Sequence, residues 1–199
     1  MKKFEDVTDE ELALLYAKGD NRAFDELLSR TQAKLFTYIM FVVRDHDIAD
    51  DIFQETFVKV IVKLQQGQYT NSGKFQFWLT RIAHNCIMDW YRQQQGRHIV
   101  EPNAENDLQK LKGSAPIDIC REMELVNEQV LTDVKKLMEA LPASQREVVY
   151  MRYYQELSFK EIAELTGVSI NTALGRMRYA LINMRRIAKE NRIELALVG

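Results

Sequence analysis

The residues with the most reactive side chains do not form a recognisable catalytic or metal-binding pattern. His84 and Cys86 stand two positions apart in a helical stretch, so their side chains do not share a face and make a poor pair of metal ligands. His46 and His98 have no obvious ligand partners. The sequence also lacks a phosphate-binding glycine loop and a zinc-protease motif. It therefore predicts no enzyme, no cofactor and no metal site.

A different chemistry is indicated by residues 158–178, which read SFKEIAELTGVSINTALGRMR. Ser158 and Ser169 are suited to cap two helices, and Gly167 permits the left-handed turn that ends the first of them. Two helices with so short a connection are typical of a helix-turn-helix. The start of its second helix can reach base edges of duplex DNA, while cations farther along meet phosphates. An ordinary helical hairpin is the alternative.

The second helix of this pair separates its side chains by face. Four residues at spacings of three and four are expected to point inward, namely Ala173, Met177, Ala180 and Met184. We expect base contacts from Asn171, Thr172 and Arg176, and backbone contacts from Lys160, Arg178, Arg185 and Arg186. Residues 170–192 hold six basic residues and one acid, a local net charge of +5. This surface suits phosphates, although cations that complement a helix dipole would look the same.

The segment 47–64 combines a core stripe with an unusual outer surface. At about 100° per residue, Phe53, Phe57, Val60 and Leu64 gather on one side. Four residues lie on the opposite side around Asp51, namely Gln54, Glu55, Val58 and Val62. Carboxylates mixed with exposed valines suit a protein partner that offers basic and apolar groups. A solvated face with two incidental valines is the alternative.

Aromatic side chains stand at both ends of the segment 75–92, with polar and cationic residues between them. The aromatic residues are Phe75, Phe77, Trp78, Trp90 and Tyr91, and the interleaved residues are Arg81, Asn85 and Arg92. Such a combination can stack unpaired bases and hold the backbone of a single strand. Most of the aromatic residues would equally fill a core, whereas Asn85 and the polar loop 69–74 are harder to explain that way.

The elements around these residues predict an all-α protein. Of 199 residues, 46% are apolar, and only 8 are glycine and 3 proline, which suits a packed protein with few turns. Helical periodicity dominates, with no convincing strand. Helices are predicted at 8–19, 20–43, 47–67, 75–95 and 119–141, then from Ser144, Ser158 and Ser169. Capping boxes are predicted at Thr8, with Glu11, and at Ser144 and Ser158.

The segment 96–120 separates two predicted domains. It contains Gly96, Pro102, Gly113 and Pro116 with little apolar periodicity, so we interpret it as a flexible linker between small helical domains at 1–95 and 121–199. The longest apolar run, 35–43, falls short of the roughly 20 residues that span a bilayer. The acidic start does not resemble a signal peptide, and two cysteines suit a reducing cytosol. We expect a cytoplasmic protein without direct membrane insertion.

Together these segments resemble the sigma-70 family of bacterial transcription initiation factors, and the two-domain form resembles its extracytoplasmic-function (ECF) subfamily. Residues 50–57, DDIFQETF, resemble the region that binds the clamp helices of the polymerase largest subunit. Residues 77–85, FWLTRIAHN, resemble the segment that melts and reads the −10 element. Residues 141–178 resemble the domain that reads the −35 element. The three blocks follow the order of the family.

The resemblance implies three sets of binding residues. Core polymerase would be bound by Asp50, Asp51, Gln54, Glu55 and Val58. The melted −10 strand, with a flipped base, would be bound by Asn71, Ser72, Lys74, Trp78, Arg81, Asn85 and Arg92. The duplex −35 element would be bound by Lys160, Ser169, Asn171, Thr172, Arg176 and Arg178.

The implied function is a sigma factor that directs promoter-specific transcription initiation. Its partners would be the clamp helices and flap of core RNA polymerase, promoter DNA and an anti-sigma factor, and the free chain would be a monomer. Two departures from the family pattern stand out. Arg92 is followed by three glutamines where many members have a basic run. Residues 173–176 read ALGR where many have Val-Lys-Ser-Arg, so the −35 preference cannot be copied from relatives.

Two other functions compete with this interpretation. A stand-alone helix-turn-helix regulator would usually dimerise and bind a palindrome by itself, and the acidic face around Asp51 argues against it. A helical adaptor could bind polymerase without binding DNA. The basic segment 170–192 and the −35-like block argue against the adaptor.

Overall fold

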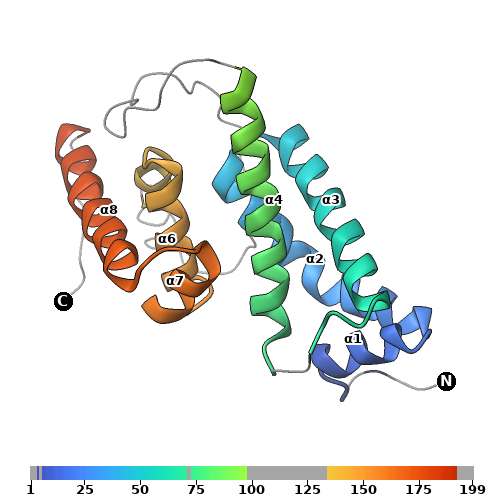
Figure 1. Ribbon diagram of the computed structural model, residues 1–199. Helices are drawn as coiled ribbons and strands as arrows, with labels where there is room; N and C mark the ends of the chain where they lie inside the picture. Colours follow the sequence, from blue (N-terminus) through green and yellow to red (C-terminus); the bar gives the residue numbers. More distant parts are fainter. Residues whose placement is uncertain (1–3, 5, 71–72, 98–133, 192–199) are drawn as a thin grey trace, which may run out of the picture. The chain divides into compact units, whose positions relative to one another are not determined.

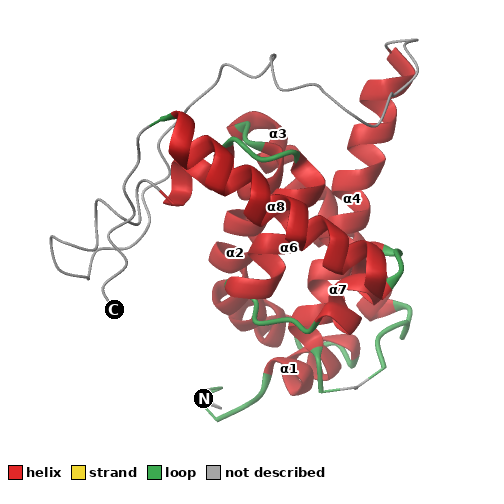
Figure 2. Ribbon diagram, turned by 90° about the vertical axis from the view of Figure 1, so that its left-hand side faces the viewer, coloured by secondary structure: helices red, strands yellow, loops and turns green. Residues whose placement is uncertain are grey.

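The computed structural model describes residues 4, 6–70, 73–97 and 134–191. Every regular element in these ranges is a helix (Figure 2). The chain divides into two compact units, Met1–Pro102 and Asn103–Gly199. The predicted all-α, two-domain architecture is therefore confirmed (Figure 1).

The first unit contains α1 (Asp9–Ala17), α2 (Asn21–Val43), α3 (His46–Gln65) and α4 (Phe75–Arg97). Local capping explains where three of these helices begin. Thr8 forms the predicted capping box with Glu11, and Asp20 caps α2. The N-cap of α3 is Asp45, whose Oδ1 accepts the N–H of Ile48 at 3.1 Å. The helix thus starts slightly before the predicted position, within the usual uncertainty of helix ends.

The core of the first unit lies where α2, α3 and α4 pack against one another, and α1 packs against the other three helices (Figure 1). Its largest fully buried side chains include Leu27, Tyr38, Leu64, Phe75 and Ile87. The predicted core stripe of α3 is confirmed at Phe57, Val60 and Leu64. Phe53 is only half-buried, with its ring edge-to-face against those of Phe36 and Phe57.

The second unit contains a helical segment at 134–139, followed by α6 (Ala143–Tyr153), α7 (Phe159–Thr166) and α8 (Ile170–Glu190). The helix α8 packs against both α6 and α7. The buried side chains between these helices include Met151, Ile162 and Ala173. Because the apolar side of α8 is buried against α6 and α7, the opposite side of this helix faces solvent.

The predicted capping box at Ser144 is wrong. The N-cap position of α6 is occupied by Pro142, which makes no side-chain cap, so Ser144 lies inside the helix. The carbonyl of Pro142 accepts the N–H groups of Gln145 and Arg146. The side chain of Arg146, although 3% exposed, donates to the carbonyls of Glu139 and Leu141 at 3.2 and 3.0 Å. The helix therefore begins directly after Pro142, before Ser144, and the buried Arg146 ties its first turn to the preceding carbonyls in place of a side-chain cap.

The helix α4 continues to Arg97, two residues past its predicted end. The remainder of the predicted linker and the predicted start of a helix at 119 lie outside the described residues. Among the helices that the structure describes, none combines the length and the apolar character needed to cross a membrane.

Candidate functional site

The solvent side of α3 carries five residues, which we call the α3 outer face: Asp51, Gln54, Glu55, Val58 and Val62. All five are exposed, and the two valines are 60% and 42% exposed. The exposure predicted for this mixed acidic and apolar surface is confirmed. Asp50 lies at its margin, where its Oδ2 is 3.1 Å from Nδ1 of His46.

Lys59 connects the α3 outer face to α4. Its Nζ lies 2.7 Å from Oε1 of Glu55 and 3.7 Å from Oδ2 of Asp89 on α4. Asp89 in turn pairs with Arg92 at 2.6 Å. The hydrogen bond to Glu55 is the main reason why the pKa of Lys59 is raised. The two nearby carboxylates therefore favour the protonated, positively charged form of Lys59.

The solvent side of α4 carries the predicted strand-binding residues, which we call the α4 outer face: Trp78, Arg81, Asn85 and Arg92. They fall within about 60° of one another around the helix axis. Arg81 and Asn85 are exposed, the side chain of Arg92 is 73% exposed, and Trp78 is half-buried. Lys74, just before the helix, is also exposed, while Asn71 and Ser72 lie outside the described residues.

His84 and Cys86 are buried within the first unit, at 5% and 0% exposure. Burial raises the pKa of the Cys86 thiol, which disfavours a reactive thiolate. Within the ranges the structure describes, no three His, Cys, Asp or Glu side chains gather in a way that could hold a metal ion.

An aromatic cluster supports the start of the α4 outer face. The ring of Tyr69 lies 5.5 Å from that of Phe75 and 4.9 Å from that of Trp78, measured between centroids. Tyr69 and Phe75 are buried at 6% and 1% exposure. Burial, with the charges of Glu10 and Asp9, raises the pKa of Tyr69 to about 12. Trp78 therefore presents part of its ring to solvent while neighbours hold the rest.

The helices α7 and α8 form the predicted helix-turn-helix. Ser158 and Glu161 make a reciprocal capping box at the start of α7. Gly167 ends that helix in the left-handed conformation, with φ of 67°. Ser169 then caps α8 by accepting the N–H of Thr172 at 3.0 Å. Three residues, 167–169, thus separate the two helices.

The predicted −35-binding residues do not form one continuous stripe. Asn171 and Arg178 are exposed and lie within about 20° of each other around α8. Thr172 and Arg176 lie on another side, and Arg176 is half-buried. Lys160 is exposed on α7. The hydroxyls of Ser169 and Thr172 lie 2.8 Å apart, so part of their hydrogen-bonding capacity is used within the helix start.

Several exposed apolar residues on α8 were left out of the predicted set. Ile170, Leu174, Tyr179 and Ile182 are between 44% and 61% exposed. The sequence did indicate that these residues are exposed, because none of them belongs to the inward-facing series of Ala173, Met177 and Ala180. Periodicity alone shows that such residues face away from the core, but it does not indicate what they contact.

Two family matches cover the two units. Residues 27–97 match Sigma-70 region 2, and residues 131–178 match Sigma-70, region 4. The α3 and α4 outer faces belong to the first match, and α7 with the first part of α8 belongs to the second.

Curated relatives match along most of their length. The chain is 29% identical to RNA polymerase sigma factor SigZ of Bacillus subtilis, over 77% of this chain and 80% of that protein. It is 29% identical to the ECF RNA polymerase sigma-E factor of Salmonella typhimurium, over 87% and 90%. It is 27% identical to the RNA polymerase sigma-H factor of Pseudomonas aeruginosa, over 85% and 88%.

Two solved structures share the fold. One is the sigma factor RpoE in complex with the anti-sigma factor NepR from Bartonella quintana, with a TM-score of 0.63, 22% identity, and coverage of 83% of this chain and 96% of that one. The other is CnrH in complex with the cytosolic domain of CnrY, with a TM-score of 0.61, 22% identity, and coverage of 92% and 97%.

Sigma factors are non-enzymatic proteins that bind core RNA polymerase and DNA, which agrees with the prediction that this chain is not an enzyme. The order of the two matched regions, the all-helical fold and the named relatives agree with one another. The chain belongs to the sigma-70 family, as an RNA polymerase sigma factor of the ECF type with a region 2 and a region 4 domain.

Proposed function

We propose that this sigma factor docks on the clamp helices of core polymerase through the α3 outer face and reads the two promoter elements through α4 and α8. The observation that carries the proposal is the placement of the α3 and α4 outer faces on two helices that pack together in one unit. A polymerase-docking surface beside a strand-binding surface would hold melted DNA against the enzyme that melts it.

The α3 outer face suits a basic and apolar partner. Asp51, Gln54 and Glu55 supply acceptors for hydrogen bonds to cationic groups, and Val58, at 60% exposure, supplies apolar area beside them. Protein interfaces commonly combine an apolar centre with a polar rim. The same partner could draw Glu55 away from Lys59.

The α4 outer face suits a single strand of the −10 element. Trp78 offers a ring for stacking, the amide of Asn85 can bond a base edge, and Arg81 can meet phosphates. Flipping a base costs a few kcal/mol, which these contacts would have to offset. Arg92 would exchange its pairing with Asp89 for a phosphate.

The second unit suits duplex DNA at the −35 element. The start of α8 would enter the major groove, where Asn171 and Thr172 can bond base edges. Leu174, at 44% exposure, can touch a thymine methyl group. Arg178 and Lys160 would contact the DNA backbone. Arg176 would contact DNA on the side of α8 that also carries Thr172.

An anti-sigma partner is part of the proposal. The solved RpoE and CnrH structures contain NepR and the cytosolic domain of CnrY, respectively. We infer that a protein of this class restrains the present chain in the cytoplasm, and that the free chain is otherwise monomeric. Co-purification with an inhibitor that reduces transcription in a dose-dependent manner would support this inference.

Run-off transcription tests the proposal as a whole. Purified core polymerase from the source organism is supplied with genomic promoter fragments, with and without this chain. Transcripts that depend on the chain, and that disappear when either promoter element is scrambled, would support it. Transcripts that survive scrambling of the −10 or −35 element would contradict the assigned reading surface.

A further inference from the structure

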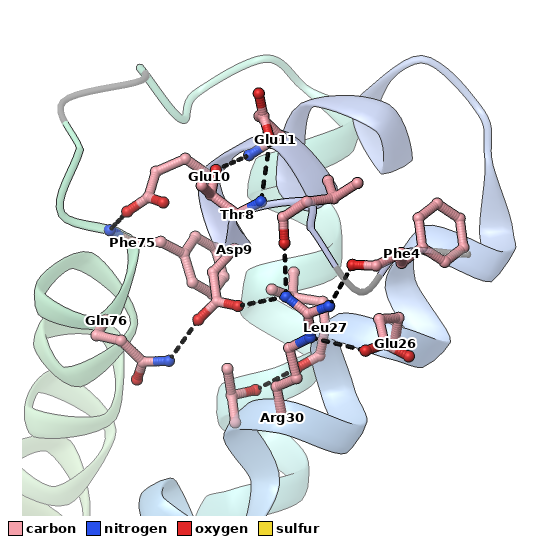
Figure 3. Close-up of polar contacts among 12 residues, drawn as sticks. Phe4, Thr8, Asp9, Glu10, Glu11, Glu26, Leu27, Arg30, Phe75 and Gln76 are labelled. Atoms are coloured by element: carbon pink, nitrogen blue, oxygen red, sulfur yellow. Dashed lines mark hydrogen bonds and ion pairs between the residues drawn. The ribbon is translucent and has the colours of Figure 1, made fainter. Parts of the chain in front are cut away.

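The first turn of α4 is held by two carboxylates that come from α1. Oε1 of Glu10 accepts the backbone N–H of Phe75 at 2.9 Å, and Oδ2 of Asp9 accepts a hydrogen bond from Nε2 of Gln76 at 3.0 Å (Figure 3). Asp9 and Glu10 are adjacent in sequence but lie more than sixty positions before their partners. We call them the α1 carboxylate pair.

Such a contact meets two needs of a helix start. The first backbone N–H groups of a helix have no partner within the helix, and negative charge near them is favourable because of the helix dipole. Glu10 therefore acts as a cap that is supplied by another helix. Because the cap is not local, the position of the first turn of α4 depends on where α1 lies.

Asp9, the first residue of the α1 carboxylate pair, is itself held in place by a cation. Nη1 of Arg30 on α2 lies 3.6 Å from Oδ1 of Asp9, and Nε of Arg30 lies 2.7 Å from Oε1 of Glu26. Arg30 also donates to the carbonyls of Phe4 and Val7, at 2.6 Å each (Figure 3). The guanidinium of Arg30 thus connects α2 both to Asp9 and to the segment before α1. These contacts fix the start of α1, where Glu10 follows Asp9 directly.

The held turn carries the aromatic part of the α4 outer face. Phe75, whose N–H is bonded to Glu10, is 1% exposed, and its ring centroid lies 5.6 Å from that of Trp78. Trp78 follows Phe75 by three positions and its N–H closes the first turn onto the carbonyl of Lys74 at 3.1 Å. A shift of Phe75 would therefore move Trp78 relative to Asn85, which lies about two turns farther along.

We propose that Asp9 and Glu10 are positioning residues for capture of the melted −10 strand, with Glu10 the more important of the two. They do not contact DNA in this proposal. They hold the first turn of α4 so that Trp78 and Asn85 keep a fixed separation along one face. The inference rests on the proposed function of the α4 outer face, and its test includes variants that report on that function separately.

The experiment measures binding of a labelled single-stranded −10 oligonucleotide by holoenzyme assembled with each variant chain. Glu10→Ala removes the cap. If the first turn of α4 must then be ordered when the strand binds, the cost of a lost cap corresponds to binding that is about fivefold weaker. Glu10→Gln keeps an oxygen that can accept the N–H of Phe75, and we expect it to restore most of the affinity. Binding to core polymerase and to a −35 duplex should remain unchanged.

Asp20→Ala is the matched control. It removes the N-cap of α2 and costs a similar amount of stability, but it leaves both carboxylates of the pair and the capped first turn of α1 in place. At equal loss of thermal stability, Asp20→Ala should bind the oligonucleotide as the unmodified chain does. If Asp20→Ala and Glu10→Ala weaken binding equally, or if Glu10→Gln fails to restore it, the positioning role is wrong.

The variants Trp78→Ala and Asn85→Ala distinguish a failure of the positioning role of Glu10 from a failure of the proposed function of the α4 outer face. If both weaken oligonucleotide binding while Glu10→Ala does not, the α4 outer face reads the strand and only the role of Glu10 is overturned. If neither weakens it, the proposed function of the α4 outer face fails, and the positioning role fails with it.

Discussion

Asn171 and Thr172 are neighbours in sequence, but their side chains leave α8 about 100° apart. Asn171 shares its side of the helix with Arg178, whereas Thr172 shares its side with the half-buried Arg176. The hydroxyl of Thr172 lies 2.8 Å from that of Ser169. Asn171 is therefore better placed than Thr172 to read a base, and Arg178 carries the more exposed charge.

We expect Asn171→Ala and Arg178→Ala to weaken −35 binding in different ways. Loss of a base contact should cost about 1–3 kcal/mol on the preferred sequence and relax the preference at one position. Loss of a phosphate contact should weaken all sequences alike and lower the slope of log affinity against log salt by about 1. Fluorescence anisotropy of holoenzyme with −35 duplexes at several salt concentrations measures both effects.

Lys34→Ala is the control for charge loss, since Lys34 is exposed on α2 in the other unit. It should change neither the affinity nor the salt slope. An Asn171→Ala chain that keeps its full preference at every −35 position would remove this residue from the base-reading set.

The double change Asp51→Arg with Gln54→Ala should abolish binding to core polymerase. It places a cation on the α3 outer face where the proposed partner is basic, and like charges at an interface cost several kcal/mol. Co-elution with core polymerase on a sizing column measures the effect. Asp25→Arg, an equal charge reversal at an exposed position of α2, should still co-elute. Retained co-elution of the double variant would place the docking surface elsewhere.

At the scale of elements, the turn between α7 and α8 depends on one residue. Gly167 has φ of 67°, in the left-handed region, although a Cβ placed there would meet nothing within 4 Å. Glycine is therefore favoured at position 167 because of the backbone conformation, and not because a side chain would lack space. Gly175 lies inside α8, where a Cβ would also meet nothing within 4 Å, and there glycine costs helix stability.

We expect Gly167→Ala and Gly175→Ala to change stability in opposite directions. The first should destabilise the second unit by about 1–2 kcal/mol, the cost of a left-handed non-glycine residue. The second should stabilise it by about 0.5–1 kcal/mol through helix propensity. Hydrogen exchange of the slowest amides in α6 and α8 measures both, because it reports on this unit without assuming two-state unfolding of the whole chain. Equal protection in the two variants would contradict this account of the turn.

At the scale of the whole molecule, the chain has two separate units with different proposed binding surfaces. In the proposed function each unit contacts a different promoter element, so one unit alone would make only part of the contacts to DNA. When polymerase holds both units, the second contact becomes intramolecular and gains from a high effective concentration. Because the binding surfaces lie on two units, strong promoter binding would depend on core polymerase.

We expect the chain alone to shift promoter DNA poorly in a gel, and core polymerase to restore a strong, specific shift. The comparison uses one promoter fragment, with the −10 and −35 elements scrambled in turn as controls. A strong shift by the chain alone on a palindromic duplex would instead indicate a stand-alone regulator.

Features that act over a few residues could be predicted before the fold was known. The caps at Thr8, Ser158 and Ser169 and the glycine at 167 marked helix starts and a turn, and the spacing along α3 and α4 separated buried from exposed faces. These signals are readable because capping and helical periodicity involve side chains within about four positions. Exposure of the α3 and α4 outer faces follows from them.

Contacts between distant segments became evident only from the packing of the helices. The fold places Glu10 on the first turn of α4, joins Lys59 to Asp89, buries Arg146 against the carbonyls before α6, and leaves Arg176 half-buried. No local pattern encodes these pairings, because they depend on which helix packs beside which and at what angle. For the same reason the capping box at Ser144 failed, since the helix begins at Ala143, before Ser144, and the buried side chain of Arg146 bonds the preceding carbonyls, a contact that no local capping pattern encodes.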